Sequence, residues 1–217
     1  ASMAFQTKNF KAHIDFDKRE GEFKANGKGS VVSFPVNQYI CYMENFKWFM
    51  DKSQLELSGN KPTAGASKVD LTGPEFISVH PKQDSLRFFA ERAKFDYQNF
   101  IIEAEVVKEI RVADAKVIPD SGKVTIERNA YMRPLENSKI EANSVTKYHN
   151  LFNCHTEIFS RRSYTASGDY AYIDELKKEQ IVHFSKVAPD TSGQTYAEGF
   201  ITDSSQFALS PAFNYQG

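Results

Sequence analysis

Apolar and polar residues alternate with a period of two along most of this sequence, and short turn signals interrupt the alternation repeatedly. Residues 12–16 and 123–126 show the pattern, and glycine-containing turns at 26–29 and 119–122 separate such segments. This period places successive side chains on opposite faces of a strand, and turns spaced by roughly 8–12 residues are typical of sandwiches, barrels and stacked sheets. The sequence therefore predicts an all-β fold of elongated, stacked, mainly antiparallel sheets, of the β-jellyroll or β-solenoid-like type.

The composition agrees with strands and argues against two classes of partner. Aromatic residues make up 13% of the chain, with 18 Phe and 10 Tyr, and both favour pleated, half-buried surfaces. With 27 basic and 28 acidic residues the net charge is −1, so no long-range field attracts nucleic acid or an anionic membrane. No apolar run is long enough to cross a membrane. We therefore expect no nucleic-acid partner and no transmembrane segment.

Residues 58–74 are the strongest candidate for a loop or linker, because they are rich in Gly, Ser, Thr, Pro and Lys. This segment divides the chain into a predicted N-terminal β unit at 1–57 and a main β domain at 75–217, with one continuous domain as the alternative. The chain begins Ala-Ser-Met and ends within a strand-like pattern at 213–217. We therefore expect a fragment of a larger protein, in which a missing signal peptide says nothing about the compartment.

An internal repeat is a further prediction. Residues 16–25 and 95–104 both contain an aromatic residue followed by Asp, then an apolar residue and an Ala at the same spacing. The pattern reads as a strand, a turn led by the Asp, and a return strand carrying a small residue. Such units stack because none can cover its own apolar face, although chance similarity between strands is the alternative.

Residues 90–96, 102–106 and 113–117 carry a resemblance to a known family. They look like the OstA-type β-jellyroll unit of lipopolysaccharide-transport proteins, and the match covers residues 86–130 and more loosely 10–25. Ala104 stands where that unit usually has Gly, and residues 97–99 replace its glycine-containing turn. The resemblance implies stacked antiparallel sheets with an apolar groove for acyl chains, in a Gram-negative cell envelope, and no catalytic residues.

The run of residues 160–164 is the first candidate for ligand binding. Arginine is suited to carboxylates and phosphates, and tyrosine rings stack on sugars. Two adjacent arginines face apart on a strand and could hold one anion only from a turn, so a solvated strand end is the alternative. The tyrosines, like the neighbouring Phe184, could equally be ordinary strand residues. The candidate ligand-binding residues are Arg161, Arg162, Tyr164, Tyr170 and Tyr172.

His149, Cys154 and His155 form a second cluster that could hold zinc. Cys154 and His155 would point to opposite faces of a strand, however, so we favour hydrogen-bonded polar positions near a sheet edge. With only Cys41 as a second cysteine, we favour two buried, unpaired thiols over one long-range disulfide.

No nucleophile elbow, zinc-protease motif, P-loop or dinucleotide-binding turn occurs in the sequence. We therefore predict a non-catalytic structural or binding module of a larger protein, with no catalytic residue, metal or cofactor. It would hold lipid, glycan or another envelope protein on a sheet face, in the periplasm, cell envelope or cell surface. The alternative is a polysaccharide-acting enzyme on a β-helix or β-sandwich, with carboxylates and the Arg161–Tyr172 region as its site.

Overall fold

The computed structural model describes residues 3–27, 29–58, 73–143, 149–202, 207–210 and 213–214. Within these residues the regular structure consists of antiparallel β-strands and three short 3₁₀ helices, η1 (Pro81–Gln83), η2 (Asp120–Gly122) and η3 (Arg128–Ala130). The predicted all-β fold with stacked antiparallel sheets is therefore confirmed. No helix in the described ranges is long and apolar enough to span a membrane.

The chain divides into two units. The first contains Ala1–Ile110, Ser121–Arg133 and Phe159–Arg161, and the second contains Arg111–Asp120, Pro134–Ile158 and Arg162–Gly217. Of the predicted linker at 58–74, residues 59–72 lie outside the described residues. The strands on either side of it, β7 (Gln54–Ser58) and β8 (Glu75–Ser78), both belong to the first unit.

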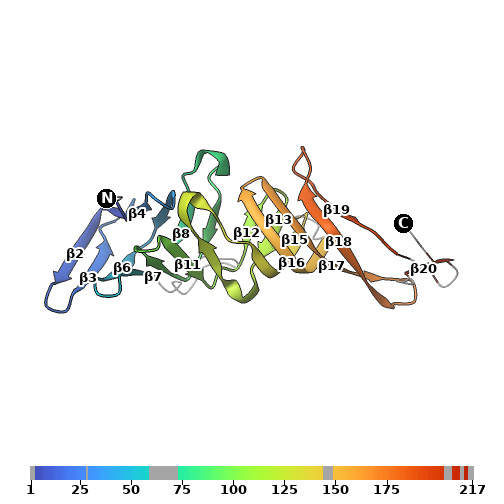
Figure 1. Cartoon of the computed structure of the whole chain (residues 1–217), viewed down its shortest axis with the longest axis horizontal. Coiled ribbons are helices and arrows are strands. Elements are labelled where there is room, and N and C mark those ends of the chain that lie inside the picture. The colour runs from blue at the N-terminus through green and yellow to red at the C-terminus, as the bar shows by residue number, and fades with distance from the viewer. Residues whose placement is uncertain are drawn as a thin grey trace. The chain divides into compact units, whose positions relative to one another are not determined.

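Two sheets make up the first unit (Figure 1). In spatial order the seven-stranded sheet consists of β14 (Val124–Ile126), β11 (Ile101–Glu105), β10 (Arg92–Asp96), β7 (Gln54–Ser58), β6 (Asn45–Phe49), β3 (Glu20–Ala25) and β2 (Phe10–Asp15). The other sheet contains β1 (Gln6–Lys8), β4 (Val31–Phe34), β5 (Tyr39–Tyr42), β8 (Glu75–Ser78) and β9 (Arg87–Phe89), and β12 (Ile110–Val112) continues it through the pair Ile110–Phe88.

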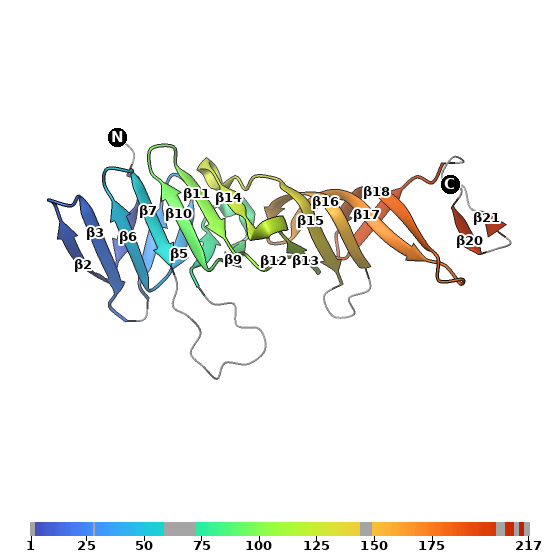
Figure 2. The same ribbon diagram turned by 90° about the horizontal axis from the view of Figure 1, so that it is seen from below.

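Consecutive hairpins alternate between these two sheets. The hairpin β2–β3 lies in one sheet, β4–β5 in the other, β6–β7 in the first again and β8–β9 in the second. Figure 2 shows β2, β3, β6, β7, β10 and β11 side by side, in chain order. Because each hairpin has one apolar face, alternation places the apolar face of one sheet against that of the other.

The core of the first unit is a layer of phenylalanine rings. Phe34 of β4 and Phe95 of β10 are fully buried and make an edge-to-face contact between the sheets, with ring centroids 4.7 Å apart. Within single sheets, Phe23 stacks on Phe46 at 4.3 Å and Phe76 on Phe88 at 5.3 Å. Aromatic side chains therefore fill the space between these strands.

Four of the hairpin loops share one backbone geometry. Each has four residues, and the last of them, before the return strand, has a positive φ: Arg19 (53°), Gln38 (54°), Ser53 (51°) and Phe100 (58°). A left-handed residue at this position reverses the chain within four residues, at a cost for any side chain with a Cβ atom. The repeated element of the fold is therefore this tight hairpin.

The predicted repeat has its turn-leading Asp in the predicted place in the second copy, but two residues away from the predicted place in the first. Asp96 leads its turn as expected, since its Oδ1 atom accepts hydrogen bonds from the backbone N–H groups of Gln98 and Asn99 at 2.9 and 3.0 Å. At the first copy that role belongs to Asp15, whose Oδ1 accepts from the Lys18 N–H at 3.0 Å, and not to Asp17. The sequence spacing paired Phe16 with Phe95, which shifted the alignment by two residues.

The second unit is built on the sheet strands that follow. In spatial order they are β13 (Ala115–Ile118), β15 (Leu135–Ala142), β16 (His149–Ser160), β17 (Ser163–Ile173), β18 (Glu179–Pro189) and β19 (Thr195–Gly199). A small two-stranded sheet, β20 (Ala208–Ser210) and β21 (Phe213–Asn214), lies near the end of the chain. The strands β16, β17 and β18 are twice as long as most of the others, and β17 and β18 form one long hairpin.

The hairpin geometry predicts that Ser53→Gly stabilises the protein. Glycine carries no penalty at a positive φ, and the backbone hydrogen bonds from Ser53 N–H to Met50 and from Tyr97 N–H to Ser53 are retained. We expect the free energy of unfolding to rise by about 0.5–1 kcal/mol, measured as a higher urea midpoint. Ser53→Val is the matched control and should lower the midpoint; a glycine variant less stable than the parent would contradict the shared loop geometry.

Candidate functional site

The strongest candidate site lies on the β17–β18 hairpin, where the inner face of the second unit's sheet leaves the core. Tyr164 and Ala166 of β17 are buried, whereas Tyr170 and Tyr172, on the same face of the strand, are only half-buried. Alternate residues of β18 continue this face. We define the aromatic face as Tyr170, Tyr172, Val182 and Phe184.

The register of the hairpin brings these side chains together. Tyr170 lies opposite Val182, and the rings of Tyr170 and Phe184 are 6.3 Å apart. On the neighbouring strand β16, the His149 ring lies 6.4 Å from that of Tyr170. The aromatic face is therefore continuous across three strands and presents rings and aliphatic groups, the chemistry that binds apolar ligands.

Gln180 provides the polar group next to this surface. It lies opposite Tyr172, and its side-chain amide makes two hydrogen bonds to the backbone of Ala208. Gln180 Nε2 donates to the Ala208 carbonyl at 2.7 Å, and the Ala208 N–H donates to Gln180 Oε1 at 2.9 Å. The preceding residue, Phe207, is buried with its ring 5.2 Å from that of Tyr172. A short stretch of the chain thus already rests on one end of the aromatic face.

Hydrogen bonds among Asp114, Thr195 and Tyr164 lie at the buried end of β17, next to the core. The Thr195 N–H donates to both carboxylate oxygens of Asp114 at 3.1 Å, and the Thr195 hydroxyl donates to Asp114 Oδ1. The same hydroxyl lies 2.7 Å from the hydroxyl of Tyr164, and burial raises the pKa of that tyrosine well above its usual value. Asp114 precedes β13 and Thr195 begins β19, which are the two ends of the second unit's strand order. The strands of this unit therefore curve enough to bring these two residues into contact.

Gly168 marks the place where the core ends and the aromatic face begins. A Cβ atom at this position would lie 2.5 Å from the Cys154 sulfur and 3.1 Å from the Phe152 carbonyl oxygen. Cys154 itself is buried, and this burial raises its pKa to about 12. The thiol fills the space left by the missing side chain, so β16 and β17 approach closely at this point.

The opposite face of the same hairpin is polar. His183 Nδ1 and Asp169 Oδ1 are 2.8 Å apart, and Asn153 donates to the other oxygen of Asp169 at 3.1 Å. The hydrogen bond with His183, followed by that from Asn153, lowers the pKa of Asp169. Ile181 also lies on this side and is 53% exposed. The hairpin therefore has one apolar and one mainly polar face.

The structure divides the five predicted ligand-binding residues between separate places. Arg161 and Arg162 do lie in a turn, between β16 and β17, but Arg161 is paired with Asp84 through an Nη2–Oδ2 distance of 3.2 Å. Tyr164 is a core residue with 1% exposure, so it does not contribute to an exposed ligand surface. Tyr172 lies near the far end of β17, about 30 Å from Arg162 at the rise of a strand. Only Tyr170 and Tyr172 belong to the candidate site.

The sequence missed Gln180 and Phe207 as members of the site. Gln180 could have been found, because it occupies the same face as Val182 and Phe184 in the alternating pattern of β18. Phe207 carries no local signal. Its position depends on the path of the chain after β19, which alternation does not predict.

The predicted cluster of His149, Cys154 and His155 does not form a metal site. Cys154 is buried and His155 is exposed on the opposite face of β16, as the alternation predicts. Among the residues that the structure describes, no group of three or more His, Cys, Asp or Glu side chains is arranged to hold a metal ion. Both Cys41 and Cys154 are buried and unpaired, as favoured from the sequence.

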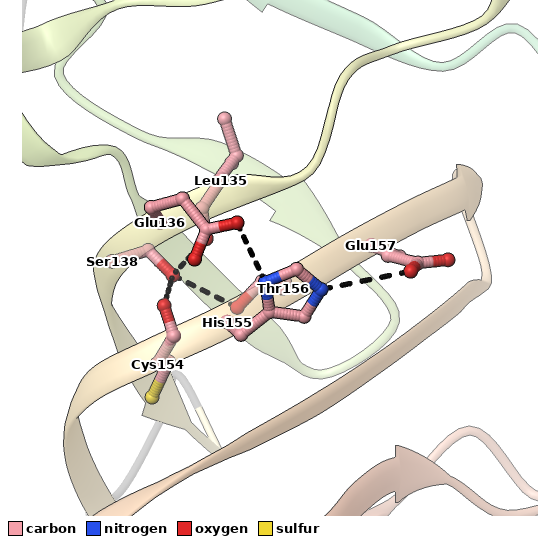
Figure 3. A network of polar contacts seen from close by, with 7 residues as sticks. All are labelled: Leu135, Glu136, Ser138, Cys154, His155, Thr156 and Glu157. Carbon is pink, nitrogen blue, oxygen red and sulfur yellow. Dashed lines mark hydrogen bonds and ion pairs between the residues drawn. The ribbon is translucent and has the colours of Figure 1, made fainter.

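Figure 3 shows what the residues around His155 do instead. On the outer face, His155 Nδ1 lies 2.8 Å from Glu136 Oε1, and His155 Nε2 lies 3.6 Å from Glu157 Oε1. On the inner face, the Ser138 hydroxyl lies 2.8 Å from that of Thr156 and donates to the Cys154 carbonyl at 3.1 Å. These contacts tie β15 to β16 from both sides at a place where their register is irregular.

Six carboxyl groups of the described residues have a pKa that departs clearly from its ordinary value. Wherever the pKa of an Asp or Glu departs clearly from its ordinary value, it is lowered. Hydrogen bonds from Lys18 lower the pKa of Asp15, and the hydrogen bond from Arg92 lowers that of Glu105. Both carboxylates serve turn or ion-pair contacts on the surface.

None of the protein-family models, curated proteins or solved structures compared with the chain matches it.

The geometry around His155 predicts a pH dependence. The hydrogen bond with Glu136, and to a lesser degree the interaction with Glu157, raises the pKa of His155 above its usual value. A raised pKa means that the contact stabilises the fold fully below the unfolded-state pKa of about 6.5, and that this contribution is lost as pH rises through the folded-state value. An NMR titration of the His155 ring should give the raised value.

Glu136→Gln should lower this pKa markedly, and Glu157→Gln should lower it less. A pKa at or below that of a histidine in an unfolded peptide would show that the two contacts are not formed in solution.

Proposed function

We propose that this chain is a non-catalytic binding module that holds an apolar ligand on the aromatic face. The observation that carries the proposal is the transition along β17 from the buried Tyr164 to the half-buried Tyr170 and Tyr172 on one face of the strand. An apolar inner face that continues beyond its core costs free energy in water, and a bound ligand recovers it.

The chemistry of the face favours an apolar ligand over a glycan. Sugar recognition combines an aromatic ring with several polar side chains that hydrogen-bond the hydroxyl groups. Here the aromatic face supplies rings and a valine. Beside it lie the His149 ring and the amide of Gln180, which is already bonded to Ala208. The setting in a larger cell-envelope or surface protein follows from the family resemblance and belongs to the same proposal.

The state of the carboxylates supports binding over polysaccharide cleavage. A glycoside hydrolase needs one carboxyl group that stays protonated near neutral pH, with a raised pKa. The resolved shifts in the described residues run in the opposite direction, and Arg161, which was considered for the enzyme site, is engaged with Asp84.

Neighbouring residues of β18 offer a matched test of the proposal. Val182 belongs to the aromatic face, whereas Ile181 lies on the opposite face of the same strand and is exposed. With 8-anilinonaphthalene-1-sulfonate as the probe, fluorescence titration should show binding to the unmodified chain. Val182→Ser should weaken this binding by about fivefold, the effect of losing about 1 kcal/mol of apolar contact.

Ile181→Ser should leave the affinity nearly unchanged, since it removes an apolar group of similar size from the other face. Far-UV circular dichroism and urea midpoints verify that both variants are folded. Equal losses in the two variants, or no binding to the unmodified chain, would contradict the proposal.

A further inference from the structure

The side chain of Gln180 pairs with the backbone of Ala208 in the way that one β-strand pairs with a residue of its neighbour. A backbone N–H and a backbone C=O of a single residue are both satisfied, by the two ends of one side-chain amide. An amide that donates and accepts together can pair with an extended polypeptide backbone whatever its side chains, because a residue in an extended strand presents its own N–H and C=O on the same side. Gln180 therefore has the chemistry of a peptide clamp.

Side-chain recognition accompanies this clamp. Phe207 precedes the clamped residue, is buried to 8% exposure, and places its ring 5.2 Å from that of Tyr172. Tyr172 and Gln180 lie directly opposite each other on β17 and β18, so one cross-strand pair receives two successive residues. An aromatic residue followed by a small one fits this pair.

We infer that the aromatic face is a receptor for an extended polypeptide with an aromatic residue followed by a small residue, and that the chain's own Phe207–Ala208 segment occupies it. This inference rests on the proposed function and names the class of its ligand. Phe207 and Ala208 cover the Tyr172 end of the face, whereas Tyr170 and Phe184 remain half-buried beyond it. The segment belongs to the same chain, so its high effective concentration keeps the Tyr172 end of the face filled against a competing peptide.

The test uses the full chain and a fluorescein-labelled synthetic peptide with the sequence of residues 203–210, followed by fluorescence anisotropy. Phe207→Ala weakens the internal occupant and should bind the peptide at least about tenfold more tightly than the unmodified chain, because the competing segment is released. Adding Gln180→Ala to Phe207→Ala removes the clamp and should reverse most of this gain. Glu179→Ala, at the neighbouring exposed position, is the matched control and should leave the gain unchanged.

Several results would overturn the inference. These are equal binding to the parent and to the Phe207→Ala chain, no effect of Gln180→Ala, or equal binding of a peptide in which Ala replaces the Phe. Dimers that form with concentration and dissolve on Gln180→Ala would assign the occupant to a second copy and contradict its assignment to the same chain. If Val182→Ser weakens the apolar probe while the peptide fails to bind, the binding face stands and only its polypeptide ligand is wrong.

Discussion

The two large sheets of this protein have an apolar face that must be covered, and the two units cover it in different ways. In the first unit, hairpins alternate between two sheets, so that Phe34 of one meets Phe95 of the other. In the second unit, the sheet curves until Asp114 binds Thr195, and Tyr164 is sealed beneath that contact. The curved part of the sheet covers the apolar face of the β17–β18 hairpin only near Tyr164. The aromatic face is the uncovered part of that hairpin, so apolar side chains become exposed along β17 although its alternation of apolar and polar residues continues.

The sequence predicted the fold class well because alternation is a local property. Alternating residues such as 12–16 and 123–126 predicted individual strands, and turn residues predicted where the strands end. What it could not show was which sheet each hairpin would join, since this depends on contacts between distant segments. The sequence also predicted the wrong Asp at the turn of the first repeat. The pair Phe16-Asp17 has the same residue types as Phe95-Asp96, but it does not occupy the equivalent positions in the hairpin.

The candidate site was predicted in part, for a related reason. Tyr170 and Tyr172 were identified by residue type, but so were Tyr164, which the curvature of the sheet buries, and Arg161, which a distant Asp84 engages. Residue type and spacing do not reveal where along a strand the core ends. Gly168 marks that point structurally, through its contact with Cys154, and its significance appears only when the neighbouring strand is in place. Phe207 could not be predicted as a member of the site either, because its contact with Tyr172 joins segments that are distant in the sequence.

The inferred polypeptide receptor depends on one contact, in which Phe207 and Ala208 rest on the aromatic face of the same chain. A nuclear Overhauser experiment on a dilute solution of the 217-residue chain measures this directly through contacts between the ring protons of Tyr172 and Phe207. We expect cross-peaks comparable to those of Phe76 and Phe88, whose ring centroids are separated by a similar 5.3 Å, against 5.2 Å for the tested pair. Their intensity should be independent of protein concentration. Clear Phe76–Phe88 cross-peaks without any between Tyr172 and Phe207 would show that the contact is not formed within the chain.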